Sequence, residues 1–134
     1  MRILNLTQHV ATQEQIEDGV IELREDAKEY VRELLTFDKI PSKEELEARA
    51  HDLSLFACTY DIIPDDDGMN ELHPNAVMLG GAPFFMGTLE RWCQSVGLVV
   101  LYAFSERESV DTVQADGSVI KKSIFKHKGF VEVS

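Results

Sequence analysis

The sequence predicts one α/β domain over residues 1–134, a Rossmann-like fold of three layers around a mixed sheet. Two continuous apolar runs, Ala76–Leu79 and Leu98–Phe104, flank a stretch whose apolar residues recur at helical spacing. Fully apolar runs of this kind are typical of parallel strands that are covered on both faces. An Asp-Gly pair between two later β-type runs predicts an antiparallel hairpin at the C-terminal edge of the sheet.

Length and composition fit a single globular domain. The chain has 134 residues, of which 44% are hydrophobic and 28% are charged. No apolar run approaches the roughly 20 residues that span a bilayer, and the N-terminus becomes polar too soon for a signal peptide. The two cysteines lack metal-ligand spacing and fit a reducing compartment. We therefore expect a soluble cytoplasmic protein without membrane contact.

The acidic residues are concentrated in one part of the chain. The formal charge is −11, and residues 13–71 hold 18 acidic and 6 basic side chains. This balance argues against binding of duplex nucleic acid, which needs a basic footprint. The acidic stretch is either a solvated outer layer of helices, or it leaves the rest of the fold free for a small anionic ligand.

The N-terminal part predicts one strand followed by three helices. Arg2–Thr7 is a short apolar run that opens the domain. Thr12-Gln13-Glu14-Gln15 matches a capping box, so a short helix should follow and stop near Gly19. Amphipathic spacing predicts a helix over Arg24–Phe37, and Ser42 is the expected N-cap of the next helix.

The middle of the chain predicts a loop and then a parallel strand–helix–strand unit. Tyr60–Pro74 is rich in turn residues, and we interpret it as a surface loop. Its consecutive residues Asp65, Asp66 and Asp67 lack the alternating spacing of a calcium loop. A helix over Phe84–Val96 connects the two apolar strands, and the crossover should be right-handed.

The C-terminal part predicts antiparallel strands. Ser109–Gln114 and Ser118–Phe125 have β-type composition and are separated by Ala115-Asp116-Gly117, a strong hairpin signal. Gly129–Val133 is a candidate for one more strand.

Three polar or small-residue segments follow the predicted parallel strands. They are Asn5–His9 after the first strand, Gly80–Pro83 after the second and Ser105–Ser109 after the third. Ligands of open α/β sheets bind beyond the carboxyl ends of the parallel strands. The sequence therefore predicts one pocket, suited to negative charge, where these three segments meet.

The pair Gly80 and Gly81 precedes a helix start. Glycines without Cβ atoms let a ligand approach the backbone, and free N–H groups of a first helical turn favour a phosphate. The segment matches neither a Walker loop nor G-x-G-x-x-G, and a tight turn without a ligand is the alternative. Ala82 belongs to the same segment, and Phe84 either stacks on a base or packs in the protein.

Asn5, Thr7, Gln8 and His9 are the candidates after the first strand. Gln8 can contact a base edge or a ribose. His9 is either a general acid or base, a hydrogen-bond donor, or a structural residue.

Arg107, flanked by Ser105 and Ser109, is the candidate after the third strand. A guanidinium suits bidentate binding of a phosphate, whereas an ion pair with Glu106, Glu108 or an acid of a helix is the alternative. The histidines lack metal-ligand spacing, so we expect neither a metal nor a cofactor.

The segments Asn5-Leu6-Thr7-Gln8-His9 and Thr12-Gln13-Glu14-Gln15 resemble those of small stand-alone CRISPR-associated ring nucleases of CARF-like fold. Most of the chain, including Gly80-Gly81-Ala82-Pro83-Phe84 and Tyr102–Val110, resembles a family of short uncharacterised bacterial and prophage proteins. The CARF resemblance implies a homodimer that binds a cyclic oligonucleotide across its two-fold axis. It implies that Thr7, Gln8, His9 and Arg107 face the ligand.

These observations lead to three functional hypotheses. The first is binding of a small phosphate-bearing signalling nucleotide, with slow cleavage that needs no metal, in which His9 and Arg107 act on the reacting phosphate. The second is a nucleotide sponge of prophage origin that binds without turnover. The third is a protein–protein adaptor whose acidic helices contact a basic partner.

Overall fold

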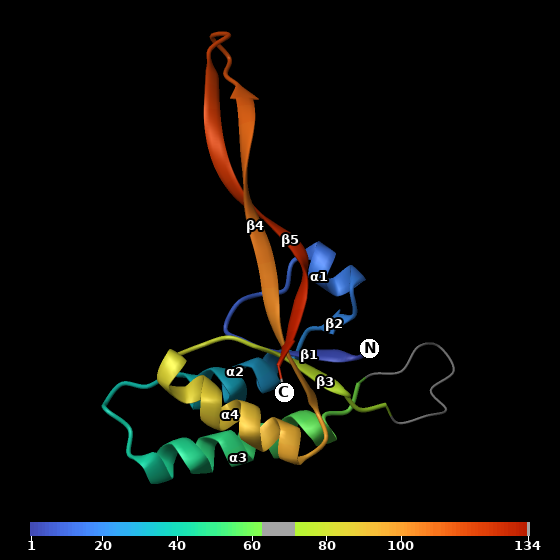
Figure 1. The fold of residues 1–134 in the computed structure, drawn as a ribbon, viewed down its shortest axis with the longest axis vertical. Coiled ribbons are helices and arrows are strands. Elements are labelled where there is room, and N and C mark those ends of the chain that lie inside the picture. The colour runs from blue at the N-terminus through green and yellow to red at the C-terminus, as the bar shows by residue number, and fades with distance from the viewer. Residues whose placement is uncertain (63–71, 134) are drawn as a thin grey trace.

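The parallel strands form the centre of a five-stranded mixed sheet, as predicted. The structure, a computed structural model, describes residues 1–62 and 72–133. The strand order is β2-β1-β3-β4-β5, in which β4 and β5 are antiparallel and all other neighbours are parallel (Figure 1). The strands are β1 (Ile3–Leu6), β2 (Val20–Ile21), β3 (Ala76–Leu79), β4 (Val99–Val113) and β5 (Val119–Val133).

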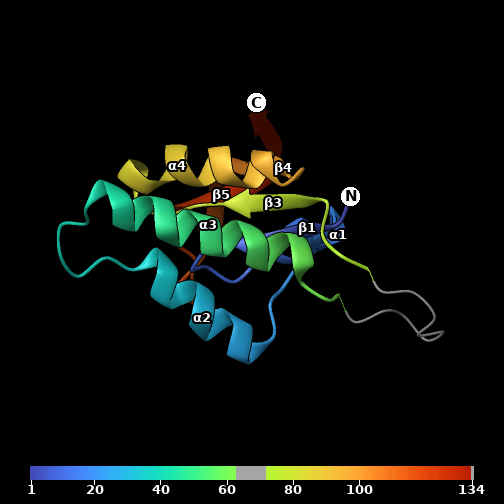
Figure 2. The same ribbon diagram turned by 90° about the horizontal axis from the view of Figure 1, so that it is seen from below.

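Three long helices pack together on one face of the sheet (Figure 2). The helices are α1 (Gln13–Glu17), α2 (Glu25–Leu35), α3 (Lys43–Thr59) and α4 (Pro83–Ser95). The short α1 contacts β2 and β5 instead. Both predicted caps are present: Thr12 forms the full capping box of α1, and the Ser42 side chain accepts a hydrogen bond from the backbone N–H of Glu45. None of the described helices is long and apolar enough to cross a bilayer.

Alternate side chains of the parallel strands enter two apolar clusters, one on each face of the sheet. Leu4, Leu6 and Val77 point toward α2, α3 and α4, where they meet the buried Phe85 and Leu89. A smaller apolar cluster lies on the opposite face of the sheet, and its buried members are Ile3, Ala11, Val20, Ala76, Met78 and Leu101. Because both faces are covered, the strands need apolar residues at every position but one. That exception is Asn5, which is 3% exposed.

The structure differs from the sequence prediction at β2 and in the length of β4. The strand β2 has two residues, too few for any periodicity, and it follows Gly19, whose φ of +108° stops α1 as predicted. The predicted strands Leu98–Phe104 and Ser109–Gln114 are parts of β4, which runs through the polar segment between them. The segment stays extended because it pairs with β5 in a solvated ribbon that needs no apolar face. The predicted loop Tyr60–Pro74 lies largely outside the described residues, and Asp65, Asp66 and Asp67 lie wholly outside them.

Beyond the body of the domain, β4 and β5 continue as a two-stranded arm (Figure 1). We define the arm as residues 105–128. The pairing of its two strands continues as far as the pair Val113–Val119. The turn between the strands contains the predicted Ala115-Asp116-Gly117. At the turn the Gln114 N–H donates to the Ser118 carbonyl at 2.7 Å. A register shift between Phe104 and Ser105 marks the base of the arm.

Glu47 of α3 fastens α4 to the body. Its carboxylate accepts hydrogen bonds from the Arg91 guanidinium at 2.8 Å and from the Trp92 indole N–H at 2.5 Å. These two hydrogen bonds hold the pKa of Glu47 below its usual value. A lowered pKa means that the carboxylate stabilises the fold above the ordinary glutamate value of about 4.3, and that this stabilisation is lost as the pH falls.

We therefore expect acid to weaken the contact between α3 and α4. Trp92 fluorescence should change as the pH falls below about 4, because the indole N–H loses its ionised acceptor. In the variant Glu47→Gln this transition should be absent. An identical transition in both proteins would contradict the assignment.

Candidate functional site

The carboxyl ends of β1 and β3 meet at a hollow of about 600 Å³. Residues Thr7–Val10, which we call the β1 loop, form one wall, and Gly80 and Gly81 form another. Tyr102 and Ala103 of β4 complete the lining on the sheet side, and we call this space the sheet hollow. Two of the three segments predicted to meet at this edge are therefore adjacent.

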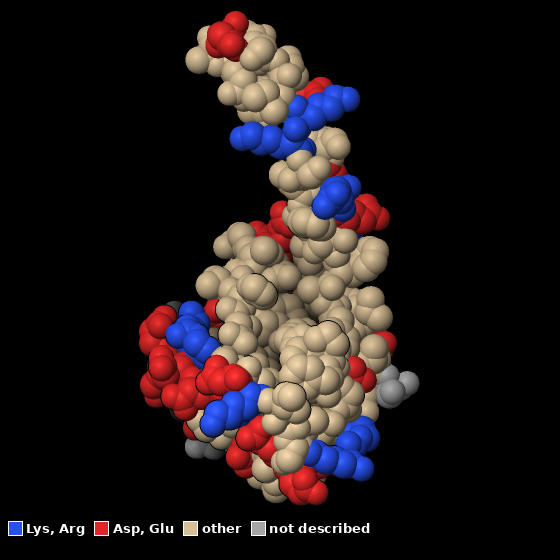
Figure 3. All heavy atoms as spheres, turned by 90° about the vertical axis from the view of Figure 1, so that its left-hand side faces the viewer, with Lys and Arg blue, Asp and Glu red and all other residues tan. Residues whose placement is uncertain are grey.

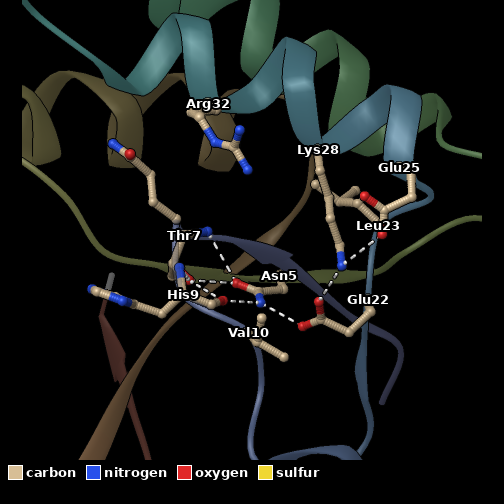
Figure 4. A pocket seen from close by; sticks show the side chains of 10 residues that line it. Asn5, Thr7, His9, Val10, Glu22, Leu23, Glu25, Lys28 and Arg32 are labelled. Atoms are coloured by element: carbon tan, nitrogen blue, oxygen red, sulfur yellow. Dashed lines mark hydrogen bonds and ion pairs between the residues drawn. The ribbon is translucent and has the colours of Figure 1, made fainter.

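The β1 loop also borders a second hollow of about 250 Å³, which we call the helix hollow. Its other lining residues come from Asn5, from the segment before α2 and from α2 itself, and include Glu22, Lys28 and Arg32 (Figure 4). Because Thr7–Val10 line both hollows, any molecule that fills the two spaces contacts the β1 loop along its length.

Asn5 fixes the conformation of the β1 loop. Its amide oxygen accepts hydrogen bonds from the Thr7 backbone N–H at 3.0 Å and from the Thr7 hydroxyl at 2.7 Å. Its amide nitrogen donates to the His9 carbonyl at 2.8 Å and to the Glu22 carboxylate at 2.6 Å (Figure 4). The side chain thus uses both its donors and its oxygen, as a buried amide should. These hydrogen bonds hold the loop in place, and Asn5 also lines the helix hollow.

Glu22 ties the β1 loop to α2. Besides Asn5, its carboxylate accepts a hydrogen bond from the Ala11 N–H at 2.8 Å and lies 3.5 Å from the Lys28 ammonium. The same ammonium lies 3.5 Å from the carboxylate of Glu25. The loop is therefore ordered before a ligand binds, which reduces the conformational entropy lost on binding.

Lys28, which is paired with Glu22 and Glu25, and Arg32 are the cationic side chains that line the helix hollow, and the sequence prediction did not include them. They lie one turn apart on α2, and Figure 4 shows the Arg32 guanidinium extending toward the β1 loop. The guanidinium is 60% exposed, and its distance of 3.9 Å to Glu29 is long for an ion pair. Each of them directly follows a buried residue of α2, Ala27 or Val31, and this spacing could have indicated that they lie near the sheet. The many acids of α2 instead favoured the interpretation of a solvated face.

Gly80 sits against the β1 loop so closely that a side chain would disturb it. A Cβ atom at Gly80 would lie 3.1 Å from the Thr7 Cγ2, and one at Gly81 would lie 3.2 Å from the Met86 Cε. The next residue, Ala82, is the N-cap of α4 and makes no side-chain capping bond. The glycines therefore allow β3, the β1 loop and the start of α4 to come together.

Alanine at Gly80 is expected to weaken binding in the sheet hollow by about tenfold, because Thr7 must shift by a few tenths of an ångström. Gly87→Ala is the matched control, since a Cβ there has nothing within 4 Å and helical alanine is favoured by about 1 kcal/mol. Isothermal titration calorimetry of both variants with a nucleotide ligand checks this. Equal affinities in the two variants would contradict it.

The two exposed polar side chains of the β1 loop differ in how they are held. Gln8 donates a weak 3.4 Å hydrogen bond from its amide to the Leu35 carbonyl at the end of α2. The backbone N–H of His9 donates to the Thr7 hydroxyl at 3.1 Å, while its exposed imidazole borders both hollows. Both side chains can reorient toward a ligand without breaking the Asn5 network.

The other predicted site residues lie away from the two hollows. The Phe84 ring is 55% exposed and packs edge-on against Phe37 at 5.1 Å between centroids, where it lines a different surface groove. Ser105, Arg107 and Ser109 lie on the arm because β4 continues where a loop was expected. The Arg107 guanidinium lies 5.4 Å from the centre of the Phe125 ring.

Two titratable groups near the sheet are held in their neutral forms. Burial and a 2.5 Å hydrogen bond to Glu90 raise the pKa of Tyr102 well above its usual value. Burial raises the pKa of the Cys93 thiol to about 12, which makes it a packing group and not a nucleophile. Within residues 1–62 and 72–133, no three histidine, cysteine, aspartate or glutamate side chains gather in a metal-binding arrangement.

Comparison with known proteins gives one match. The model of the family described as "Uncharacterized protein MJ1673 family" matches residues 1–131. No curated protein and no solved structure matches the chain.

Proposed function

The chain belongs to the Uncharacterized protein MJ1673 family. From the geometry of the candidate site, we propose that this protein binds a small phosphate-bearing nucleotide. The observation that carries this proposal is the meeting of the β1 loop with Gly80 and Gly81, beside two cationic side chains of α2. Carboxyl ends of parallel strands are the usual ligand position in such sheets.

Each part of a nucleotide has a suitable counterpart in the two hollows. The Arg32 guanidinium faces the helix hollow and suits a phosphate. The Lys28 ammonium lines the same hollow, where it lies 3.5 Å from the carboxylates of Glu22 and Glu25. Gln8 offers an amide with donors and an acceptor for a base edge. The sheet hollow is lined by the apolar Met78, Leu79 and Ala103, on which a base or ribose can pack.

A cyclic signalling nucleotide is the ligand class we propose. The combined hollows offer more than one place for a phosphate-bearing unit, since cations line one and backbone groups of Gly80 and Gly81 line the other. The resemblance of Asn5–His9 and Thr12–Gln15 to CARF-like ring nucleases supports the same class.

Cleavage of the bound nucleotide is the second candidate function, and the exposed imidazole of His9 favours it. In such a reaction a ribose 2′-hydroxyl attacks the adjacent phosphorus, the bond to the 5′-oxygen breaks, and a 2′,3′-cyclic phosphate forms. His9, which borders both hollows, would take the hydroxyl proton and return it to the leaving oxygen. Arg32 would stabilise the charge that develops on the phosphate oxygens.

One experiment separates binding from cleavage. The purified protein is incubated with radiolabelled cyclic dinucleotides and cyclic oligoadenylates, and bound and free material is analysed by chromatography. Intact ligand retained by the protein indicates a binder, whereas linear products indicate an enzyme, in which case His9→Ala should retain the ligand uncleaved. If no member of the panel is retained and none is cleaved, the proposal is contradicted.

A further inference from the structure

The arm exposes a large amount of apolar surface for a protein of this size. Its large apolar side chains are at least 41% exposed, and Val113 and Phe125 are each 71% exposed. The set within the arm is Val110, Val113, Val119, Ile120, Ile124 and Phe125. A lone two-stranded hairpin is at best marginally stable in water, and contiguous exposed apolar patches mark interaction sites. The arm therefore has the composition of a segment that another surface covers.

Both faces of the arm contribute to this surface. Cross-strand partners share a face, so the pair Thr112–Ile120 lies on one face with Ile124, and the pair Val113–Val119 lies on the other with Phe125. A partner that touches only one face would leave the other apolar side chains in water. A partner that packs on one face of the arm therefore covers one of these two apolar sets.

The charges on the arm argue against pairing of one arm with another through their strand edges. The β5 strand carries Lys121, Lys122, Lys126 and Lys128, and the paired part of β4 carries three acids. Two-fold pairing of β5 with β5, or of β4 with β4, would bring like charges together, a device that blocks edge association. Edge-to-edge pairing between equivalent strands of two arms is therefore disfavoured.

This chain itself carries an acidic surface with an exposed apolar groove. Residues 13–59 hold 13 acidic and six basic side chains. At the connection between α2 and α3, a groove is lined by Phe37, Ile40, Pro41, Leu46 and Phe84, and Ile40 is 98% exposed. Figure 3 shows Lys and Arg along the middle of the arm with Asp or Glu beside them, and on the body it shows Asp and Glu interspersed with Lys and Arg. The arm projects away from the helices, so it cannot reach the groove of its own chain (Figure 1).

We propose that two copies of this chain form a dimer by exchanging arms, each arm docking in the α2–α3 groove of the other copy. A two-fold arrangement of this kind closes after two copies, because each supplies one arm and one groove. It sets apolar residues of the arm against the groove, covers Ile40 and brings the lysines of β5 toward acidic helices. The dimer does not depend on the proposed ligand.

Sedimentation velocity of the full chain tests the proposal with two variants. The arm variant carries Ile124→Ser and Phe125→Ser, and the groove variant carries Ile40→Asp. The wild type should sediment as a dimer of the 15.1 kDa chain, and each variant alone should dissociate at least about tenfold more readily. Circular dichroism checks that the variants fold, and Lys121→Glu with Lys122→Glu offers an arm variant without loss of apolar contacts.

Mixing the two variants gives the sharpest result. A mixed dimer retains one intact contact, between the normal arm of the groove variant and the normal groove of the arm variant. Equimolar mixing should therefore restore dimers that neither variant forms alone. A wild type that stays monomeric at about 100 µM, or a groove variant that dimerises like the wild type, would overturn the proposal.

Discussion

Replacing Asn5 with alanine is expected to lower the free energy of unfolding by about 2–3 kcal/mol. The substitution removes every hydrogen bond of a buried amide and leaves the Glu22 carboxylate, the Thr7 N–H and the His9 carbonyl without this partner. Unsatisfied buried groups cost more than the hydrogen bond itself contributes. Urea unfolding followed by circular dichroism measures the effect.

Thr12→Ala is the matched control for this prediction, since Thr12 is exposed and lies a few residues further along the same segment. It removes the N-cap of α1, which should cost about 1 kcal/mol, and it leaves the Asn5 hydrogen bonds in place. The account requires a larger loss for Asn5→Ala. A loss no greater than that of Thr12→Ala would show that the β1 loop is ordered by other contacts.

Removing both cations of α2, as Lys28→Ala with Arg32→Ala, is expected to weaken nucleotide binding by about 100-fold. Each hydrogen bond to a charged group contributes about 1.5–3 kcal/mol, and solvent exposure of Arg32 reduces its share. Fluorescence anisotropy with a labelled cyclic oligoadenylate measures the affinity. The loss should shrink at high salt, because part of it is electrostatic.

The control for this change has the same effect on net charge. Lys39→Ala with Lys43→Ala also removes two positive charges from the helical part of the chain, and neither residue lines either hollow. Affinity should stay within about twofold of the wild type in this control. Equal losses in the two double variants would indicate a general field effect and not a site on α2.

Most of the fold followed from local patterns. The apolar run at Ala76–Leu79 and the buried start of the run at Leu98–Phe104 identified central strands, because burial on both faces excludes polar residues there. Caps at Thr12 and Ser42 identified helix starts because their side chains satisfy free backbone N–H groups. The length of β4 was missed because a solvated ribbon imposes no apolar pattern on residues such as Arg107.

One part of the candidate site was predictable, because the direction of parallel strands alone places their carboxyl ends at the same edge of the sheet. The rule that strand ends share an edge brought together the β1 loop and Gly80, which are far apart in sequence. It could not identify Lys28 and Arg32, since their place depends on how α2 lies over the end of β1. It also could not show that Asn5 is buried and makes four hydrogen bonds within the protein, because a buried amide and a ligand contact have the same residue type.

Amide chemical shifts tell most directly whether the two hollows form one nucleotide site. A ¹⁵N-labelled sample is titrated with the cyclic oligonucleotide that binds most tightly, and shift changes are mapped residue by residue. The account predicts the largest changes at Thr7–Val10, at Gly80 and Gly81, and along α2 at Lys28 and Arg32. Changes confined to the arm or to α3, or no saturable changes at any residue, would contradict it.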